Sequence, residues 1–254
     1  MSFAERLRVG ESVVGSWLTL PSGDAAEAVA GAGYDFAVVD TEHAPVDVGT
    51  ATEMLRGVAA APGETAGLVR VAENDPARVK RVLDAGPAGV VVPMVDTPEA
   101  ARAAVSACEY PPEGVRGVAA ARAADYGRSF ESSVAGADPL TVVQVESEAA
   151  VENAGAIAAV DGIDALFVGP ADLSAALGAF PDWDGPVVGD AIETVVDAGA
   201  AADTPVGTLA ADPAEVPAWL DRGFDFLAVG VDAGLLAAGA DEAVAAFEAE
   251  PDGD

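Results

Sequence analysis

Residues 140–169 read LTVVQVESEAAVENAGAIAAVDGIDALFVG, and this stretch decides the fold class. Two short apolar runs rich in β-branched residues, LTVVQVE from 140 and DALFVG from 164, flank an alanine-rich run with helical spacing. A strand, a helix and a second strand in that order form a βαβ unit, whose two strands lie parallel in one sheet. The stretch therefore predicts an α/β protein with a parallel sheet.

The same alternation continues on both sides of this stretch. Further strand candidates are SVVGSWLTL from 12, YDFAVVDT from 34, TAGLVRV from 65, AGVVVPMV from 88, TPVGTLA from 204 and FDFLAVGVD from 224. Eight such units fit a closed (β/α)8 TIM barrel or an open doubly wound sheet. No GxGxxG or GxxxxGKS/T motif follows the first strand, which argues against a nucleotide-binding open sheet. We therefore expect a single TIM-barrel domain over residues 1–254.

The chain carries 43 acidic and 12 basic residues, a formal net charge of −31. Such a charge repels nucleic acid and anionic membranes, so neither is an expected partner. The acids are spread along the chain, a distribution suited to high salt, and we expect a halophilic source. No run of 18 apolar residues occurs and the opening MSFAERLRVG is charged, so we expect no membrane span, no signal peptide and a cytoplasmic protein.

Three residue types that often carry chemistry occur once each, as His43, Cys108 and Lys80. A single cysteine excludes an intrachain disulfide and a multi-cysteine zinc site, and we expect a buried, inert thiol. A Schiff-base mechanism would need Lys80 as nucleophile. That lysine lies in the helical pattern NDPARVKRVLDAG rather than at a strand end, which argues against such a mechanism.

Polar residues gather where the predicted strands end, which in a barrel is the mouth that holds the active site. They are Asp40, Thr41, Glu42 and His43 after the second strand, Arg70 at the end of the third, Gln144 and Glu146 on the fifth, and Asp172 after the sixth. Side chains alternate along a strand, so Gln144 and Glu146 project to the same face. The segment 110–138 is long for a loop, and we place it over the mouth.

Glu146 and Asp172 are candidate ligands for a hard divalent cation, Mg2+ or Mn2+, that keeps several waters for substrate to replace. The alternative is structural, with Glu146 capping the next helix and Asp172 beginning the helix ADLSAALG. The run from Gly169 to Asp172 also turns backbone N–H groups toward the mouth. That arrangement suits a substrate carboxylate, unless it is a plain strand-to-helix turn.

His43 is a candidate general base or water activator oriented by Asp40, or else a structural histidine. Arg70 presents a planar cation and is a candidate for stabilising an enolate oxygen. The alternative for Arg70 is an ion pair with Glu42. We also include Trp17, on the first predicted strand, among the residues expected to bind substrate.

Six motifs together resemble the HpcH/HpaI aldolase family, the metal-dependent aldolases of 2-keto-3-deoxy sugar acids and 4-hydroxy-2-oxo acids. They are DTEHAP at 40–45, VPMV at 92–95, YPPEGVRG at 110–117, QVES at 144–147, VDGIDALFVGPADLS at 160–174 and AVGVD at 228–232. Their order and spacing match from about Gly15 to Leu236. The resemblance implies a TIM barrel of the pyruvate type that acts as a carbon–carbon lyase.

The resemblance also implies roles at the mouth. Glu146 and Asp172 match the ligands of the divalent metal, for which Co2+ joins Mg2+ and Mn2+ as a candidate. Gln144, Ala171 and Asp172 match positions that contact the pyruvyl substrate, the last two through backbone amides. The segments VAEND after the third strand and GTLAADP on the seventh depart from the family's usual form, which leaves the aldehyde preference open.

Further implied roles concern the base and the assembly. Arg70 matches the enolate-stabilising residue and His43 the base, whose basicity a carboxylate raises. Asp84 falls at the position of that carboxylate, at a helix end remote from its own mouth, so it would act across a subunit interface, with Asp40 as the local competitor. A homo-oligomer is implied, a hexamer built as a trimer of dimers. The segment LLAAGADEAVAAFEAE suits packing on a partner, or else an ordinary eighth barrel helix.

Two other functions fit parts of the pattern. A lyase that cleaves CoA esters of the citrate or malyl type would share the barrel, but CoA phosphates favour a basic patch and this chain has few bases. A non-catalytic barrel that binds a 2-keto acid is disfavoured by the acid pair, histidine and arginine together. We expect a divalent-metal-dependent aldolase that reversibly cleaves a 4-hydroxy-2-oxo acid, such as a 2-keto-3-deoxy sugar acid or 2,4-dihydroxyhept-2-enedioate, to pyruvate and an aldehyde.

Overall fold

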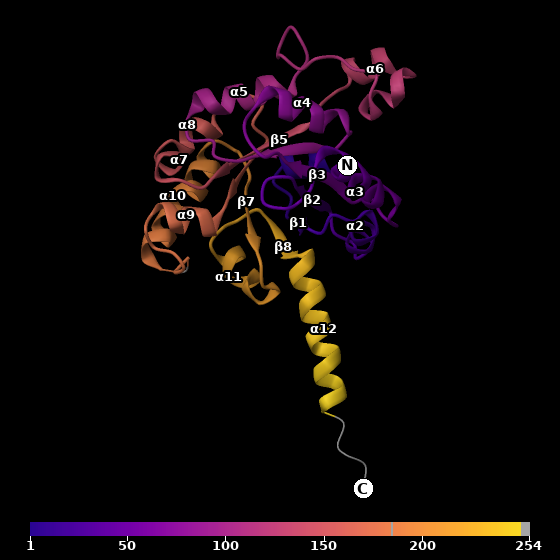
Figure 1. The fold of residues 1–254 in the computed structure, drawn as a ribbon. Helices are drawn as coiled ribbons and strands as arrows, with labels where there is room; N and C mark the ends of the chain where they lie inside the picture. Colours follow the sequence, from indigo (N-terminus) through magenta and orange to yellow (C-terminus); the bar gives the residue numbers. More distant parts are fainter. Residues whose placement is uncertain (184, 250–254) are drawn as a thin grey trace.

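Eight parallel strands close into a barrel in chain order, with β8 paired to β1 (Figure 1). The computed structural model describes residues 1–183 and 185–249. The strands are β1 (Val13–Leu18), β2 (Phe36–Asp40), β3 (Ala66–Arg70), β4 (Gly89–Val92), β5 (Leu140–Val145), β6 (Ala165–Val168), β7 (Val206–Ala210) and β8 (Phe226–Val231). Every predicted strand is confirmed, and the closed barrel rather than the open sheet is the architecture.

Helices follow the strands along the chain and surround most of the barrel. They are α2 (Gly23–Ala30), α3 (Val48–Ala60), α4 (Pro76–Asp84), α5 (Pro98–Cys108), α7 (Glu148–Glu152), α8 (Ala154–Ala158), α9 (Pro170–Ala176), α10 (Pro186–Ala201) and α11 (Val216–Asp221), with a 3₁₀ turn η2 (Pro213–Glu215) before the last. Local sequence sets their starts. The side chains of Asp75 and Thr97 accept hydrogen bonds from first-turn N–H groups of α4 and α5, and a proline follows each.

Two hydrophobic cores hold the barrel. One lies between the strands and the outer helices and consists mainly of valine, alanine and leucine. The other fills the barrel interior, where α1 (Phe3–Arg8) packs against it at the end where the strands start, and it contains the rings of Trp17, Phe36, Phe167 and Phe226. Gly15 makes room for one of these rings, because a Cβ at that position would lie 2.3 Å from Phe36.

The segment 110–138 contains η1 (Arg122–Gly127) and α6 (Phe130–Ala135) and stands beside α4 (Figure 1). Arg122 donates to the carbonyls of Ala85 and Gly86, just before β4, at 2.7 and 3.2 Å. The predicted position over the mouth is therefore wrong, since these contacts lie at the end where the strands start. The reason is topological, because the segment joins the end of α5 to the start of β5, and both lie at that end.

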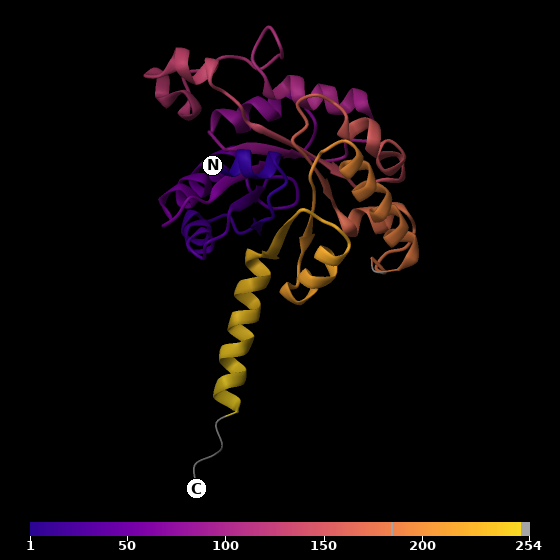
Figure 2. The ribbon, with the colours of Figure 1, turned by 180° about the vertical axis from the view of Figure 1, so that it is seen from behind.

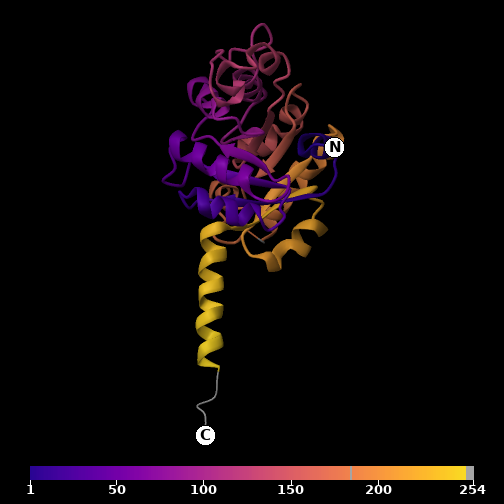
Figure 3. The same cartoon turned by 90° about the vertical axis from the view of Figure 1, so that its right-hand side faces the viewer.

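The last helix, α12 (Asp232–Glu248), projects away from the barrel (Figures 1, 2 and 3). Every residue from Leu236 to Ala249 is exposed. Leu236, Val244 and Phe247 expose 65%, 58% and 83% of their surface. The alternative of an ordinary eighth helix packed on its own barrel is therefore excluded for this chain. No helix within the described ranges combines the length and the apolar character needed to cross a membrane.

Candidate active site

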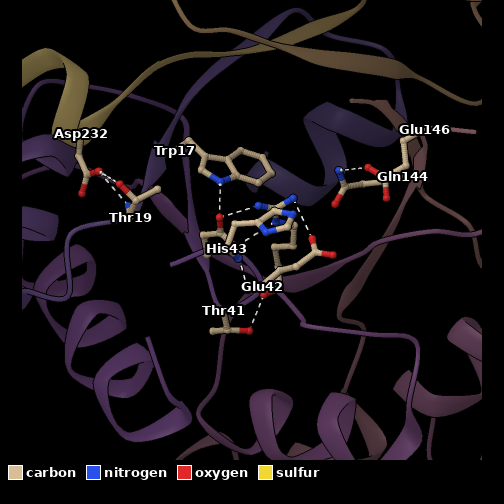
Figure 4. Close-up of polar contacts among 10 residues, drawn as sticks. Trp17, Thr19, Thr41, Glu42, His43, Gln144, Glu146 and Asp232 are labelled. Carbon is tan, nitrogen blue, oxygen red and sulfur yellow. Dashed lines mark hydrogen bonds and ion pairs between the residues drawn. The ribbon is translucent and has the colours of Figure 1, made fainter. Parts of the chain in front are cut away.

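Polar side chains from several strand ends converge on one mouth, shown in close-up in Figure 4. Asp40 ends β2 and Arg70 ends β3, and the strand register pairs these two residues directly. Gln144 and Glu146 come from β5 and its end, on another side of the mouth. The predicted convergence of polar residues at the strand ends is confirmed.

Arg70 is a buried guanidinium held on three sides. Its Nε and Nη2 donate to the two carboxylate oxygens of Asp40 at 3.0 and 2.5 Å. Its Nη1 lies 2.9 Å from Oε2 of Glu42, and its Cζ lies 5.0 Å from the ring centroid of Trp17. Burial alone would raise the pKa of Asp40, but the hydrogen bonds and charge of Arg70 outweigh it, and the pKa is lowered. The mouth therefore contains an ionised, geometrically fixed pair.

Asp40 also orders the turn that carries His43. Its Oδ1 accepts hydrogen bonds from the backbone N–H groups of Glu42 and His43 at 2.9 and 3.2 Å. The His43 side chain is exposed, and its ring makes no hydrogen bond to any described residue. In this chain Asp40 therefore holds the backbone of His43 and the guanidinium of Arg70, and not the imidazole that it was predicted to orient.

Glu146 is a buried carboxylate with 4% of its surface exposed. Its Oε1 accepts from the backbone N–H of Met94 at 2.8 Å, and its Oε2 accepts from the side-chain amide of Gln144 at 3.0 Å. Burial raises the pKa of Glu146 to about 7; the hydrogen bond from Met94 opposes the rise, and the charge of Asp172 reinforces it. An uncompensated carboxylate here is unfavourable, and a bound cation would relieve it.

The surroundings of Glu146 fit a divalent metal ion. Asp172 lies exposed in the first turn of α9, and Oε1 of Gln144 is buried without a hydrogen-bond partner. A Cβ at Gly169 would lie only 3.0 Å from Oε2 of Glu146, so glycine keeps this space open. Among the described residues no group of three His, Cys, Asp or Glu side chains could hold a metal. Mg2+ is usually bound by one or two protein carboxylates, with water or substrate oxygens as its other ligands, and Glu146 and Asp172 fit this pattern.

Three sequence candidates lie away from this mouth. Asp84 ends α4, where it lies 3.9 Å from Nη2 of Arg116, and burial raises its pKa. Lys80 is exposed on the same helix, as predicted, which places the only lysine outside the mouth. Cys108 is buried and its pKa is raised to about 11 by burial, so the expected inert thiol is confirmed.

Two contacts at the mouth escaped the sequence analysis. Met94 has φ of 52°, and its N–H points at Glu146; its only sequence signal was its place in the motif VPMV. Asp232 accepts hydrogen bonds from the N–H and hydroxyl of Thr19, both at 2.8 Å, and from the N–H of Leu20 at 3.0 Å (Figure 4). This clamp, whose signal was an acid directly after the last strand, joins the start of α12 to the chain following β1.

Comparison with known proteins places this geometry in a family. The HpcH/HpaI aldolase/citrate lyase family matches residues 14–238. The chain belongs to this family. A 4-hydroxy-2-oxo-heptane-1,7-dioate aldolase from Salmonella arizonae is 42% identical over 252 residues, which cover 98% of this chain and 95% of the relative.

Solved structures agree with the assignment to this family. A HpcH/HpaI aldolase/citrate lyase family protein from Burkholderia cenocepacia is 39% identical, with a TM-score of 0.94 over 98% of this chain and 99% of its own. A HpcH/HpaI aldolase from Desulfitobacterium hafniense is 30% identical, with a TM-score of 0.86 over 97% and 96% of the two chains. The protein is thus an aldolase, a carbon–carbon lyase of a family that depends on a divalent metal ion.

Proposed function

We propose that this HpcH/HpaI aldolase reversibly cleaves a 4-hydroxy-2-oxo acid to pyruvate and an aldehyde. The observation that carries the proposal is the presence in one mouth of a buried carboxylate suited to a metal, Glu146, and a buried cation, Arg70. Cleavage leaves an electron pair on C3 of the pyruvate unit, delocalised onto the C2 oxygen, and a fixed cation stabilises that charge. The names of the heptanedioate aldolases among the relatives support this substrate class.

We assign the metal to Glu146 and Asp172. Oxygen ligands suit Mg2+ or Mn2+, with Co2+ as a third candidate. When bound, the ion polarises the C2 carbonyl as a Lewis acid. The backbone N–H groups of Ala171 and Asp172 lie in the first turn of α9 and have no acceptor within the helix. Together with the Gln144 side chain, they would bind the carboxylate and keto oxygens of the substrate. Gly169 leaves the space that this binding needs.

The proton steps fall to His43. Its ring is exposed at the mouth and is free to take the proton of the C4 hydroxyl, directly or through a water, as the C3–C4 bond breaks. Arg70 would hold the negative charge that develops on the C2 oxygen. The proton that His43 accepts, or one from water, then returns to C3 of the enolate to give pyruvate. Asp40 fixes the guanidinium beforehand, and the Trp17 ring packs against it, so the cation need not reorganise during the reaction. In the reverse direction the same groups add pyruvate to an aldehyde.

We further propose that Asp84 assists His43 from a neighbouring subunit. Asp84 lies at the end of α4, where the strands start, whereas His43 lies at the opposite end of the barrel. The imidazole has no acceptor among the described residues of its own chain, so a carboxylate from a second copy would make it a stronger base. This arrangement requires a homo-oligomer, and the family resemblance favours a hexamer.

The projecting α12 supports assembly. Leu236, Val244 and Phe247 share one side of the helix at spacings of eight and three residues, and each leaves more than half of its surface exposed. Exposed apolar stripes of this kind are characteristic of interaction surfaces. We propose that a second copy of the chain covers α12.

The acidic composition supports a proposal about the working environment. A net charge of −31 on 254 residues repels itself at low ionic strength and is screened in concentrated salt. We propose that the enzyme works in the cytoplasm of a halophilic organism.

Pyruvate release from a panel of 4-hydroxy-2-oxo acids, with and without a chelator, tests the proposed function. We expect cleavage that disappears after chelation and returns with Mg2+ or Mn2+. Borohydride in the presence of pyruvate should leave Lys80 unmodified. Full activity after exhaustive chelation, or a covalent adduct at Lys80, would contradict the proposal.

A further inference from the structure

A second polar cavity lies at the opposite end of the barrel from the mouth. It has a volume of about 570 Å³ and lies between the loop that precedes β4 and the segment that contains η1 and α6. Two guanidinium groups, those of Arg116 and Arg122, line it. Two cations on one cavity are notable because the whole chain has 12 basic residues against 43 acidic ones.

Arg116 is buried, and its Nε lacks a hydrogen-bond partner within the described residues. Only 4% of its surface is exposed. Its one charged neighbour is Asp84, at 3.9 Å, too far for a hydrogen bond. The ring of Tyr110 lies 4.5 Å from its Cζ and fixes the plane of the guanidinium. A buried N–H donor without an acceptor, such as this Nε, is unfavourable, and a ligand that supplies an acceptor would relieve it.

Arg122 is the second cation of the cavity. One of its nitrogens, Nη1, donates to the carbonyls of Ala85 and Gly86, and no carboxylate among the described residues lies within 4 Å of it. The acid that also lines the cavity, Asp138, is already engaged, since its Oδ1 accepts from Nη2 of Arg8 at 2.8 Å. Of the two cations of the cavity, Arg116 is therefore only loosely paired, with Asp84, and Arg122 pairs with no carboxylate of the described residues.

We propose that this cavity is a binding site for a small dicarboxylate anion. A guanidinium presents parallel N–H donors that match the two oxygens of a carboxylate, and two guanidinium groups match two carboxylates. The volume falls within the roughly 300–1,000 Å³ typical of small-molecule sites. The site lies where the strands start, at the opposite end of its own barrel from Glu146, so its occupancy does not depend on the metal.

Succinate is the probe, titrated calorimetrically into the chelator-treated full chain at fixed KCl. We expect one saturable site per chain, weakened about tenfold or more in Arg122→Gln because a charge-assisted pair is lost. Arg102→Gln removes an exposed arginine of α5 that pairs with Glu99 and should bind like the wild type. Arg70→Lys, at the mouth, should also leave binding unchanged.

Arg122→Gln also removes the hydrogen bonds that hold the segment 110–138 to Ala85 and Gly86, so it can weaken binding by altering the structure. A second variant separates this effect from the loss of the charge. Ala123 is exposed and lines the same cavity, so Ala123→Asp adds a repelling carboxylate without removing a contact, and it should abolish succinate binding while circular dichroism stays unchanged. Succinate should raise the Tm of the wild type and not that of Ala123→Asp. The proposal is overturned if the wild type shows no saturable binding, if Arg70→Lys removes binding while Arg122→Gln does not, or if inorganic phosphate binds more tightly than succinate.

Discussion

The carboxylate of Asp40 holds the guanidinium of Arg70 through two hydrogen bonds, Nε to Oδ1 at 3.0 Å and Nη2 to Oδ2 at 2.5 Å. Both residues end neighbouring strands and both are buried. The cation to which we assign the enolate charge is therefore positioned by the barrel itself before substrate arrives. Asp40 keeps Arg70 in place and contacts His43 only at its backbone N–H, not at the imidazole.

Asp40→Asn should lower both stability and turnover. Removing one charge of a buried pair leaves the other uncompensated, which typically costs about 3–5 kcal/mol of unfolding free energy. The loosened Arg70 should reduce kcat about 100-fold, the usual effect of a small misplacement of a catalytic group. Urea unfolding and steady-state kinetics measure the two effects. Glu73→Gln is the control, because it breaks an exposed pair with Arg78 and should cost less than about 1 kcal/mol.

The raised pKa of Glu146 predicts a pH dependence of the metal-free protein. Between its ordinary value of 4.5 and about 7, the unfolded chain has lost the proton that the folded chain retains. Unfolding free energy should therefore fall as pH rises through this window, by up to about 3 kcal/mol, and level off above pH 7. Glu146→Gln should lack this component. An identical pH slope in the wild type and the variant would refute the assignment.

The same proton competes with the metal. Below pH 7, binding of Mn2+ must displace the proton of Glu146, so affinity should fall about tenfold for each pH unit. Titration of chelator-treated enzyme with Mn2+ at pH 5.5 to 8 measures this. Asp172→Asn should weaken binding at every pH, whereas Asp96→Asn alters a carboxylate that accepts from Ser147 and should not affect it. A metal affinity independent of pH would argue against Glu146 as ligand.

Complementation between chains tests the role of Asp84. His43→Ala and Asp84→Asn should each be poorly active alone. When the two variants are mixed and reassembled, some interfaces bring an intact His43 to an intact Asp84, and part of the activity should return. Recovery should require subunit exchange, which light scattering of differently tagged chains can follow. A fully active monomer, or no recovery in verified mixed oligomers, would contradict the proposal.

Charge placed on the apolar stripe of α12 should dissociate the proposed oligomer. Leu236→Asp combined with Phe247→Asp should shift the mass measured by light scattering toward the monomer, because association would bury carboxylates. Val187→Asp, an equally drastic change at a 53% exposed valine of α10, should leave the mass unchanged. Unchanged mass in the double variant would contradict the proposal that a second copy of the chain covers α12.

Salt should stabilise the protein. Raising KCl from 0.1 to 1 M shortens the Debye length from about 10 to about 3 Å, which weakens repulsion among the surface acids. Tm measured from 0.1 to 3 M KCl should rise steadily. A flat or falling Tm would refute the halophilic proposal.

The strands and the mouth were predictable because both follow from short-range patterns. Apolar β-rich runs gave all eight strands, and parallel topology alone brings Arg70 and Glu146 to one end. The partner of Asp40 was not predictable in the same way, because His43 is three residues away and Arg70 is thirty, and only the register of β2 and β3 decides between them. The direction of α12 was not predictable either. A helix with apolar residues at helical spacing has the same sequence pattern whether it packs on its own barrel or on that of another molecule.

The clamp at Asp232 has a consequence for how two molecules meet. Thr19 and Leu20 donate three hydrogen bonds to this carboxylate, at the start of α12. These bonds hold the direction in which α12 leaves the barrel and restrict its rotation relative to the barrel. A rigid arm loses little orientational entropy when a second molecule captures it, so the association constant benefits from order that folding has already imposed. Thr19 and Leu20 directly follow β1, the strand that carries Trp17. The direction of α12 and the position of Trp17 at the mouth are therefore set by the same strand.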